Sequence, residues 1–225
     1  MGPRRLGARR TIQVTLFTYG GVPVKLHNTF FIIAALFIIS GVLETGLLGG
    51  VRGAMLILGL FGSVLLHEMG HVAMAQRFGI RTRSITLHVL GGMASIEKEP
   101  ENPVEEIYIA LAGPAVNLLL LLLAVPLVYM GVPGGFELAF INLIMGVFNL
   151  VPAYPMDGGR VLRAGLSLKM GHRRATEVSL KITSIFAIGF VIIGLYTGWF
   201  GLALIGGFLL FISYAQCQCS GIKMK

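Results

Sequence analysis

Charge is scarce in this chain, whose 225 residues are 12% charged and 55% hydrophobic. A soluble domain needs a more polar surface, so this balance excludes one and indicates a membrane protein with several spans. The 18 Lys and Arg residues outnumber the 10 Asp and Glu residues. They are scattered between apolar segments, however, and form no stripe with interleaved aromatic residues. We therefore expect no nucleic-acid partner.

Cysteine is also scarce, and neither a signal peptide nor an internal repeat is predicted from the sequence. The two cysteines, Cys217 and Cys219, end the last apolar segment, where we expect reduced thiols with a structural role or none. The N-terminal arginines precede a mixed stretch and no apolar core, so no cleavable signal peptide is predicted. There is no internal repeat. We expect one transmembrane domain, residues 1–225.

Long apolar segments are what the chain has in place of charge. Six are predicted to cross the membrane, at about 28–42, 51–78, 108–130, 136–150, 176–197 and 199–217. Weak alternation around glycine pairs at 11–26 and 80–97 is typical of β-hairpins, and a short amphipathic helix is expected at 159–170. The predicted fold class is an all-α polytopic membrane protein with about six transmembrane helices and small membrane-associated β-strands.

The sequence His67-Glu68-Met69-Gly70-His71 lies inside the apolar segment 51–78. Residues four apart share one face of a helix, so His67 and His71 can bind one ion. H-E-x-x-H is the zinc-metallopeptidase pattern, in which the glutamate is the general base. The alternative is a polar cluster that neighbouring helices satisfy, but ionisable groups at bilayer depth are costly and by default functional. We predict that this site binds one Zn²⁺ and that Glu68 is the general base. Gly70, which has no side chain, is predicted to let the backbone of another segment come close to the site.

The positive charges test the order of the spans. If the N-terminus, the loops after the second and fourth spans and the C-terminus share one side, that side holds 17 of the 18 Lys and Arg residues. The other side holds Arg52 alone. Lys and Arg are enriched on the cytoplasmic side, so the bias predicts a multi-pass cell-membrane protein with six spans and both termini in the cytoplasm.

Depth in the membrane points to a third metal ligand. His67 lies about 24 Å into the second span, within a core about 30 Å thick. The fourth span enters from the same side and runs about 21 Å before a proline-containing turn. Asp157 is the ionisable residue just beyond that turn, so we predict it as a ligand; its alternative role is a cap of the next helix. Asn149 lies at the end of the fourth span and could donate a hydrogen bond to the oxyanion that develops during hydrolysis. The spacing of Asn149 from Asp157 alone does not establish this role.

Other polar residues are expected to stay out of the metal site. His27 precedes the first span and is interpreted as an interfacial residue. His88 lies in the second hairpin and has no ligand-like spacing to a partner. Asn117, in the third span, is expected to make a hydrogen bond between helices.

The two motifs together resemble a known family. His67 to His71, followed by Asn149-Leu150-Val151-Pro152-Ala153-Tyr154-Pro155-Met156-Asp157-Gly158-Gly159, looks like the site-2 protease family of intramembrane zinc metalloproteases. The likeness runs from Gly21 through the fifth span and includes Ala112-Gly113-Pro114. It implies that His67, His71 and Asp157 bind one zinc, that Glu68 activates water and that Asn149 assists the transition state. It also implies cleavage of a membrane-spanning protein substrate within the lipid bilayer.

Two other functions use the same residues. A zinc or cation transporter would distribute its ligands along a path through several spans, whereas here they converge at one depth. A catalytically inactive relative that binds membrane helices would not need Glu68, which is intact. Zinc-dependent cleavage of a single-span substrate, absent in Glu68→Gln, separates the three. The oligomeric state does not follow from the sequence.

Overall fold

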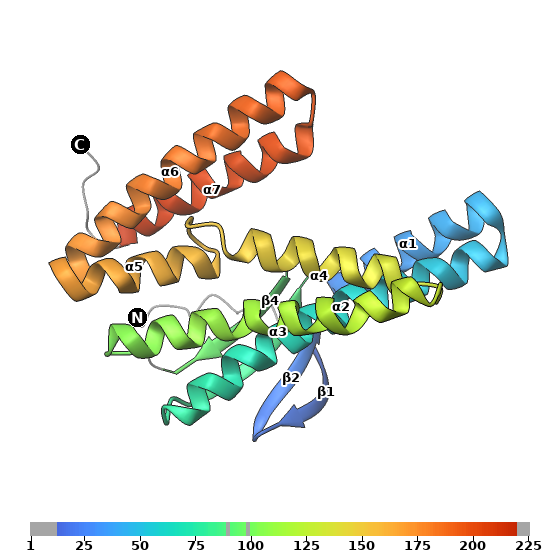
Figure 1. Ribbon diagram of the computed structural model, residues 1–225, viewed down its shortest axis with the longest axis horizontal. Helices are drawn as coiled ribbons and strands as arrows, with labels where there is room; N and C mark the ends of the chain where they lie inside the picture. Colours follow the sequence, from blue (N-terminus) through green and yellow to red (C-terminus); the bar gives the residue numbers. More distant parts are fainter. Residues whose placement is uncertain (1–12, 89–90, 98–99, 220–225) are drawn as a thin grey trace, which may run out of the picture.

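The computed structural model describes residues 13–88, 91–97 and 100–219. This part of the chain is mostly helical and also holds one small sheet (Figure 1). Its helices are α1 (Thr29–Thr45), α2 (Leu47–Arg77), α3 (Pro103–Tyr129), α4 (Gly135–Asn149), α5 (Asp157–Met170), α6 (His172–Thr197) and α7 (Phe200–Cys219). The hairpin of α6 and α7 splays away from the layer that contains α2, α3 and α4 (Figure 1).

Four of the helices, α2, α3, α6 and α7, are long and apolar enough to cross a membrane. They correspond to the predicted spans 51–78, 108–130, 176–197 and 199–217. The predicted spans 28–42 and 136–150 correspond to α1 and α4, which are apolar but have 17 and 15 residues. Many large apolar side chains on these helices face outward, as a hydrocarbon environment allows.

The sheet joins two hairpins. β1 (Gln13–Tyr19) pairs with β2 (Val22–His27), and β3 (Thr82–His88) pairs with β4 (Gly91–Ile96), both antiparallel. The weak alternation of apolar and polar residues around the glycine pairs therefore predicted both hairpins correctly. A parallel pairing of β2 with β3 combines them into the order β1-β2-β3-β4, which local alternation does not encode because α1 and α2 lie between these strands.

One face of the sheet packs against α2. The apolar side chains of β2 and β3 alternate, since successive residues of a strand point to opposite faces. The core they form with the helix comprises Val22, Val24, Leu26, Ile85 and Leu87 from the strands and Ile57, Phe61 and Val72 from α2. This packing fixes the sheet beside the helix that carries the two motif histidines.

The turn between α4 and α5 brings the second motif back to the helices. Pro152 and Pro155 follow the end of α4 and block its continuation. The predicted amphipathic helix is present as α5 and begins at Asp157, two residues earlier than expected. Near the other end of the described chain, Cys217 is buried and packs against Leu180 on α6.

Candidate metal centre

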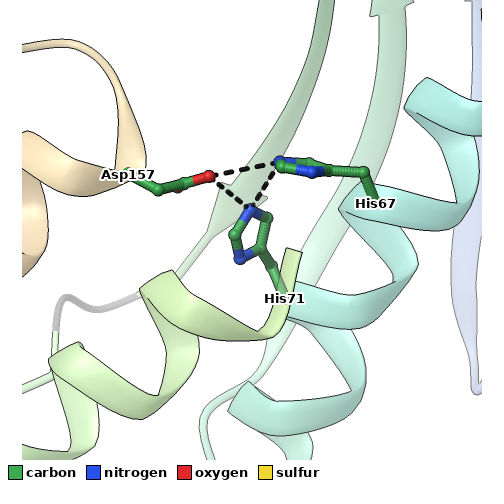
Figure 2. A group of neighbouring side chains, drawn as sticks. All are labelled: His67, His71 and Asp157. Atoms are coloured by element: carbon green, nitrogen blue, oxygen red, sulfur yellow. Dashed lines mark hydrogen bonds and ion pairs between the residues drawn. The ribbon is translucent and has the colours of Figure 1, made fainter. Parts of the chain in front are cut away.

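Three buried side chains from two helices meet at one point (Figure 2). The Nε2 atoms of His67 and His71 on α2 lie 3.0 Å apart. Oδ2 of Asp157, at the start of α5, lies 3.2 Å from each of them. One ligand atom from each of the three side chains lies within 4.8 Å of the other two, which is close enough for all three to bind one metal ion. The structure therefore brings together the residues that spacing and depth suggested.

Asp157 does not cap its own helix. The N-cap of α5 is Met156, and Asp157 occupies the first turn with its carboxylate directed at the two histidines. The capping alternative for Asp157 is thus wrong. Its second oxygen, Oδ1, lies 3.8 Å from Nη1 of Arg160, one turn further along α5. This contact helps to hold the carboxylate in place.

Each histidine is held through its other ring nitrogen. Nδ1 of His71 donates to the main-chain carbonyl of Ile109 at 2.7 Å, and Nδ1 of His67 donates to Oδ1 of Asn117 at 2.5 Å. Because a carbonyl oxygen accepts and does not donate, the protons are on the Nδ1 atoms. Both Nε2 atoms therefore present lone pairs toward Asp157. A metal cation bound between these three electron-rich atoms would balance the buried carboxylate.

The spacing of these atoms suits zinc. Zinc binds nitrogen and oxygen at about 2.0 to 2.2 Å, so two ligands of a tetrahedral ion lie about 3.3 Å apart. The observed separations of 3.0 to 3.2 Å are close to that edge length. Two imidazoles and one carboxylate also match the three-ligand set of catalytic zinc sites, which keep a fourth position open.

Glycine residues make room for the centre. A Cβ atom at Gly113 on α3 would lie 2.3 Å from Nε2 of His71, so any side chain there would collide with the site. A Cβ atom at Gly70 would lie 2.8 Å from the carbonyl oxygen of Ala112. Gly70 thus allows the backbone of α3 to approach α2, as predicted.

The remaining predicted site residues adjoin the ligand-bearing segments in the sequence. Glu68 is half-buried beside β4, where a Cβ atom at Gly92 would lie 2.3 Å from its Cγ atom. Asn149 is half-buried and is the last residue of α4, just before the turn that leads to Asp157. His27 and His88 lie elsewhere, with ring centroids 4.7 Å apart at the ends of β2 and β3.

Two contributions were missed by sequence reasoning. Asn117 makes the expected bond between helices, to Asn142 on α4, but it also holds His67. The buried pair of Glu106 and Arg163 was not foreseen either. For Asn117 the signal was a polar residue inside an apolar span, which reveals a need for a partner without naming it. Glu106 and Arg163 lie in polar or amphipathic segments, where the sequence carries no such signal.

The sequence matches peptidase family M50 over residues 55–134 and 135–190, which together contain the two histidines, Glu68, Asn149 and Asp157. The chain belongs to this family. The predicted resemblance to site-2 proteases is thereby confirmed.

Similar proteins and a similar solved structure agree with this assignment. The chain is 35% identical over 189 residues to a zinc metalloprotease of Methanocaldococcus jannaschii, covering 81% of this chain and 54% of that protein. It is 34% identical over 169 residues to stage IV sporulation protein FB of Bacillus subtilis, covering 73% and 55%. The chain thus spans about half the length of these curated relatives. The solved structure of the site-2 protease from Methanocaldococcus jannaschii matches with a TM-score of 0.68 and 32% identity, covering 91% of this chain and 94% of that one.

Proposed function

We propose that this M50 member is an intramembrane zinc metalloprotease that hydrolyses peptide bonds within the membrane-spanning segments of protein substrates. The observation that carries the proposal is the buried triangle of His67, His71 and Asp157, with Glu68 beside it in a long apolar helix. The zinc metalloproteases among its relatives support the identity of the metal. No specific observation favours transport or an inactive role.

Each residue of the site has a proposed role. His67, His71 and Asp157 hold the Zn²⁺ ion, which when bound lowers the pKa of water toward neutrality and polarises a peptide carbonyl. Glu68 accepts a proton from the attacking water and returns it to the leaving amine. The amide of Asn149 donates a hydrogen bond to the developing oxyanion.

The substrate must expose a carbonyl that a helix hides in its own hydrogen bonds. We propose that a locally unwound substrate segment pairs with β4, which lies at one end of the strand order among the described residues. The proximity of Gly92 on β4 to Glu68 supports this choice of edge. An extended segment there would run beside the catalytic carboxylate.

The membrane topology is proposed from charge and helix length. Six crossings with both termini in the cytoplasm place 17 of the 18 Lys and Arg residues on the inner side. Arg52, the exception, pairs with Glu137 at 2.6 Å, and both belong to segments that enter from the outer side in this arrangement. At about 22 Å, α4 is shorter than the hydrocarbon core and ends at the depth of the site. Both chain ends lie outside the described residues.

Cleavage of a reconstituted single-span substrate in vesicles tests the function. The unaltered protein is expected to cleave in a zinc-dependent manner, and Glu68→Gln is expected to retain zinc but lose activity, since it removes only the base. Glu177→Gln is a matched control because Glu177 is a partly exposed residue of α6 that pairs with Lys181. Equal cleavage by the Glu68→Gln variant and the control would contradict the proposal. Zinc flux across the vesicle without cleavage would favour the transporter instead.

A further inference from the structure

We propose that Ser63, Asn142 and Asn117 form a buried hydrogen-bond chain that holds His67 in the tautomer and orientation required for zinc. This positioning role rests on the metal function proposed above. None of the three residues needs to touch metal or substrate, since the chain acts through the ring of His67.

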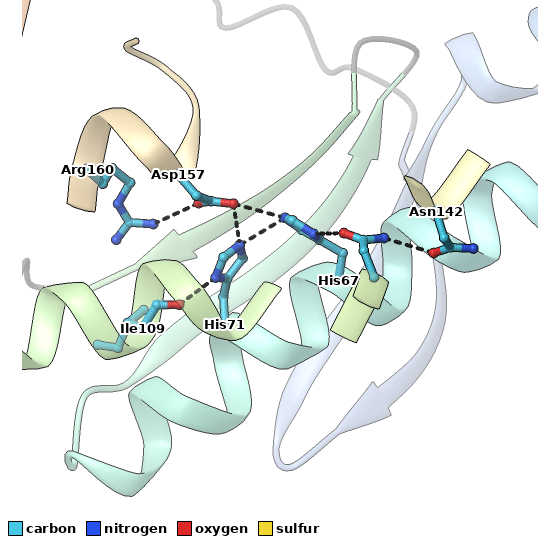
Figure 3. Close-up of polar contacts among 7 residues, drawn as sticks. His67, His71, Ile109, Asn142, Asp157 and Arg160 are labelled. Atoms are coloured by element: carbon cyan, nitrogen blue, oxygen red, sulfur yellow. Dashed lines mark hydrogen bonds and ion pairs between the residues drawn. The ribbon is translucent and has the colours of Figure 1, made fainter. Parts of the chain in front are cut away.

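The hydrogen-bond chain runs from α2 through α3 to α4 and back to α2, and Figure 3 shows the part of it between His67 and Asn142. Asn142 on α4 has its Nδ2 atom 3.0 Å from Oγ of Ser63 on α2. Nδ2 of Asn117 on α3 donates to Oδ1 of Asn142 at 2.9 Å, and Oδ1 of Asn117 accepts from Nδ1 of His67. All four residues are at most 4% exposed. Water therefore does not compete for these bonds.

The direction of every bond follows from one main-chain carbonyl. The Leu138 carbonyl oxygen lies 2.9 Å from one terminal atom of the Asn142 side chain, and because a carbonyl only accepts, that atom is the amide nitrogen. The amide oxygen of Asn142 then faces Asn117, which must turn its own nitrogen toward it. The oxygen of Asn117 is left facing His67.

This polarity decides where His67 carries its proton. An oxygen opposite Nδ1 requires a proton on Nδ1, so Nε2 is left with its lone pair directed at Asp157 and His71. If Asn117 were reversed, its nitrogen would face Nδ1 and favour the other tautomer, which cannot bind metal through Nε2. A ligand histidine needs its second nitrogen oriented in this way.

The two histidines differ in what holds them. His71 is bonded to the main-chain oxygen of Ile109, which no side-chain substitution removes. His67 depends on side chains alone. We therefore expect the affinity for zinc to be adjustable through the His67 branch, from positions on α3 and α4.

Zinc affinity of the full chain in detergent, measured by competition with a chelator, tests the inference. Loss of an outer-shell partner typically weakens metal binding by about 10-fold to 100-fold. Asn117→Leu is expected to fall in that range, and Asn142→Leu to weaken binding by about 10-fold, because Asn117 is then free to reverse. Asn117→Asp retains an acceptor for Nδ1 and is expected to bind zinc more tightly than Asn117→Leu.

Ser63→Ala and Ser213→Ala form a matched pair of mild variants. Both serines are at most 2% exposed and bond to a neighbouring helix. Ser63 leads to His67 through Asn142 and Asn117, whereas Ser213 bonds to the main-chain oxygen of Leu180 on α6. Ser63→Ala is expected to weaken zinc binding by a few fold, and Ser213→Ala to leave it unchanged. Equal zinc affinities of Ser63→Ala and Ser213→Ala would count against the hydrogen-bond chain, even if a leucine variant failed to fold.

The visible spectrum of the Co²⁺-loaded protein separates positioning from general stability. At saturating cobalt, Asn142→Leu is expected to shift the absorption bands, since the ring of His67 is held differently, whereas Ser213→Ala is expected not to. Wild-type affinity and spectra in both Asn117→Leu and Asn142→Leu would overturn the inference while leaving the proposed protease intact. Failure of the unaltered chain to bind Zn²⁺ or Co²⁺ would overturn both.

Discussion

Arg163 on α5 donates a hydrogen bond to the carboxylate of Glu106 on α3, with both side chains no more than 6% exposed. The same guanidinium lies 5.5 Å from the ring centroid of Tyr154, in the turn that leads to Asp157. This buried pair therefore fastens α5 and the turn before it to α3. Because α3 also packs against α2 through Gly70, the pair helps to set Asp157 opposite the two histidines.

Removal of one partner of this pair should destabilise the protein. Glu106→Ala removes the carboxylate that pairs with the buried guanidinium of Arg163, and breaking a buried ion pair typically costs about 3 to 5 kcal/mol. Thermal unfolding of the metal-free protein in detergent measures the loss. Glu177→Ala, in the exposed pair with Lys181, is the control and is expected to cost less than about 1 kcal/mol. Equal stability of the two variants would show that the buried pair does not hold α5.

Removal of Asp157 should remove the metal. Asp157→Ala leaves two ligands of three, so zinc content after dialysis is expected to fall to near zero, and cleavage with it. Elemental analysis of the purified protein checks this, and circular dichroism checks the fold. His172→Ala changes an exposed histidine at the start of α6 and is expected to keep full zinc. Full zinc in Asp157→Ala would exclude it from the site.

A methyl group at Gly92 should impair the base without removing the metal. It would approach Cγ of Glu68 to 2.3 Å, so the carboxylate must move. General-base catalysis contributes about 10²-fold to 10⁴-fold, and we expect Gly92→Ala to lower kcat by at least about 10-fold with zinc content unchanged. Gly62→Ala on α2, whose Cβ would meet no atom within 4 Å, should leave kcat unchanged. Normal turnover in Gly92→Ala would show that Glu68 is not confined by β4.

Single cysteines should report the proposed topology. In a background lacking Cys217 and Cys219, an impermeant thiol reagent added to intact cells is expected to label position 47 or 134 but not position 173. The first two lie at the outer ends of helices in the six-span arrangement, and position 173 lies in a basic stretch on the inner side. Outside labelling of position 173 would reverse the orientation.

Substrate helices that unwind easily should be cut faster. Gly, Pro and Asn weaken helices, so single spans that contain them are expected to be cleaved faster than poly-Leu spans of equal length. Short unstructured peptides have no helix to unwind and should lose this dependence. Comparison of cleavage rates for both kinds of substrate, each with matched sequences around the cut, provides the test. Equal rates for Gly-containing and poly-Leu spans would argue against unwinding as a requirement.

The sequence by itself indicated most of the helices and strands and the three residues of the centre. The pairing of His67 with His71 follows from the helical period, which is local, and the two hairpins follow from alternation within each segment. Four spans followed from the length of their apolar runs, and Asp157 from the depth at which the fourth segment stops. The role of Asn149 in catalysis and the crossing of the membrane by α1 and by α4 remain predictions.

Tertiary structure decided how these parts meet. The parallel pairing of β2 with β3, the bond between Asn117 and His67, and the pair of Arg163 and Glu106 join positions far apart in the chain, with 50 residues separating the second pair and 57 the third. The periodicity of residues within a single helix or strand cannot predict such long-range contacts. They arise because apolar helices pack closely at small residues, and each buried polar group then takes the one complementary partner that packing has brought within reach.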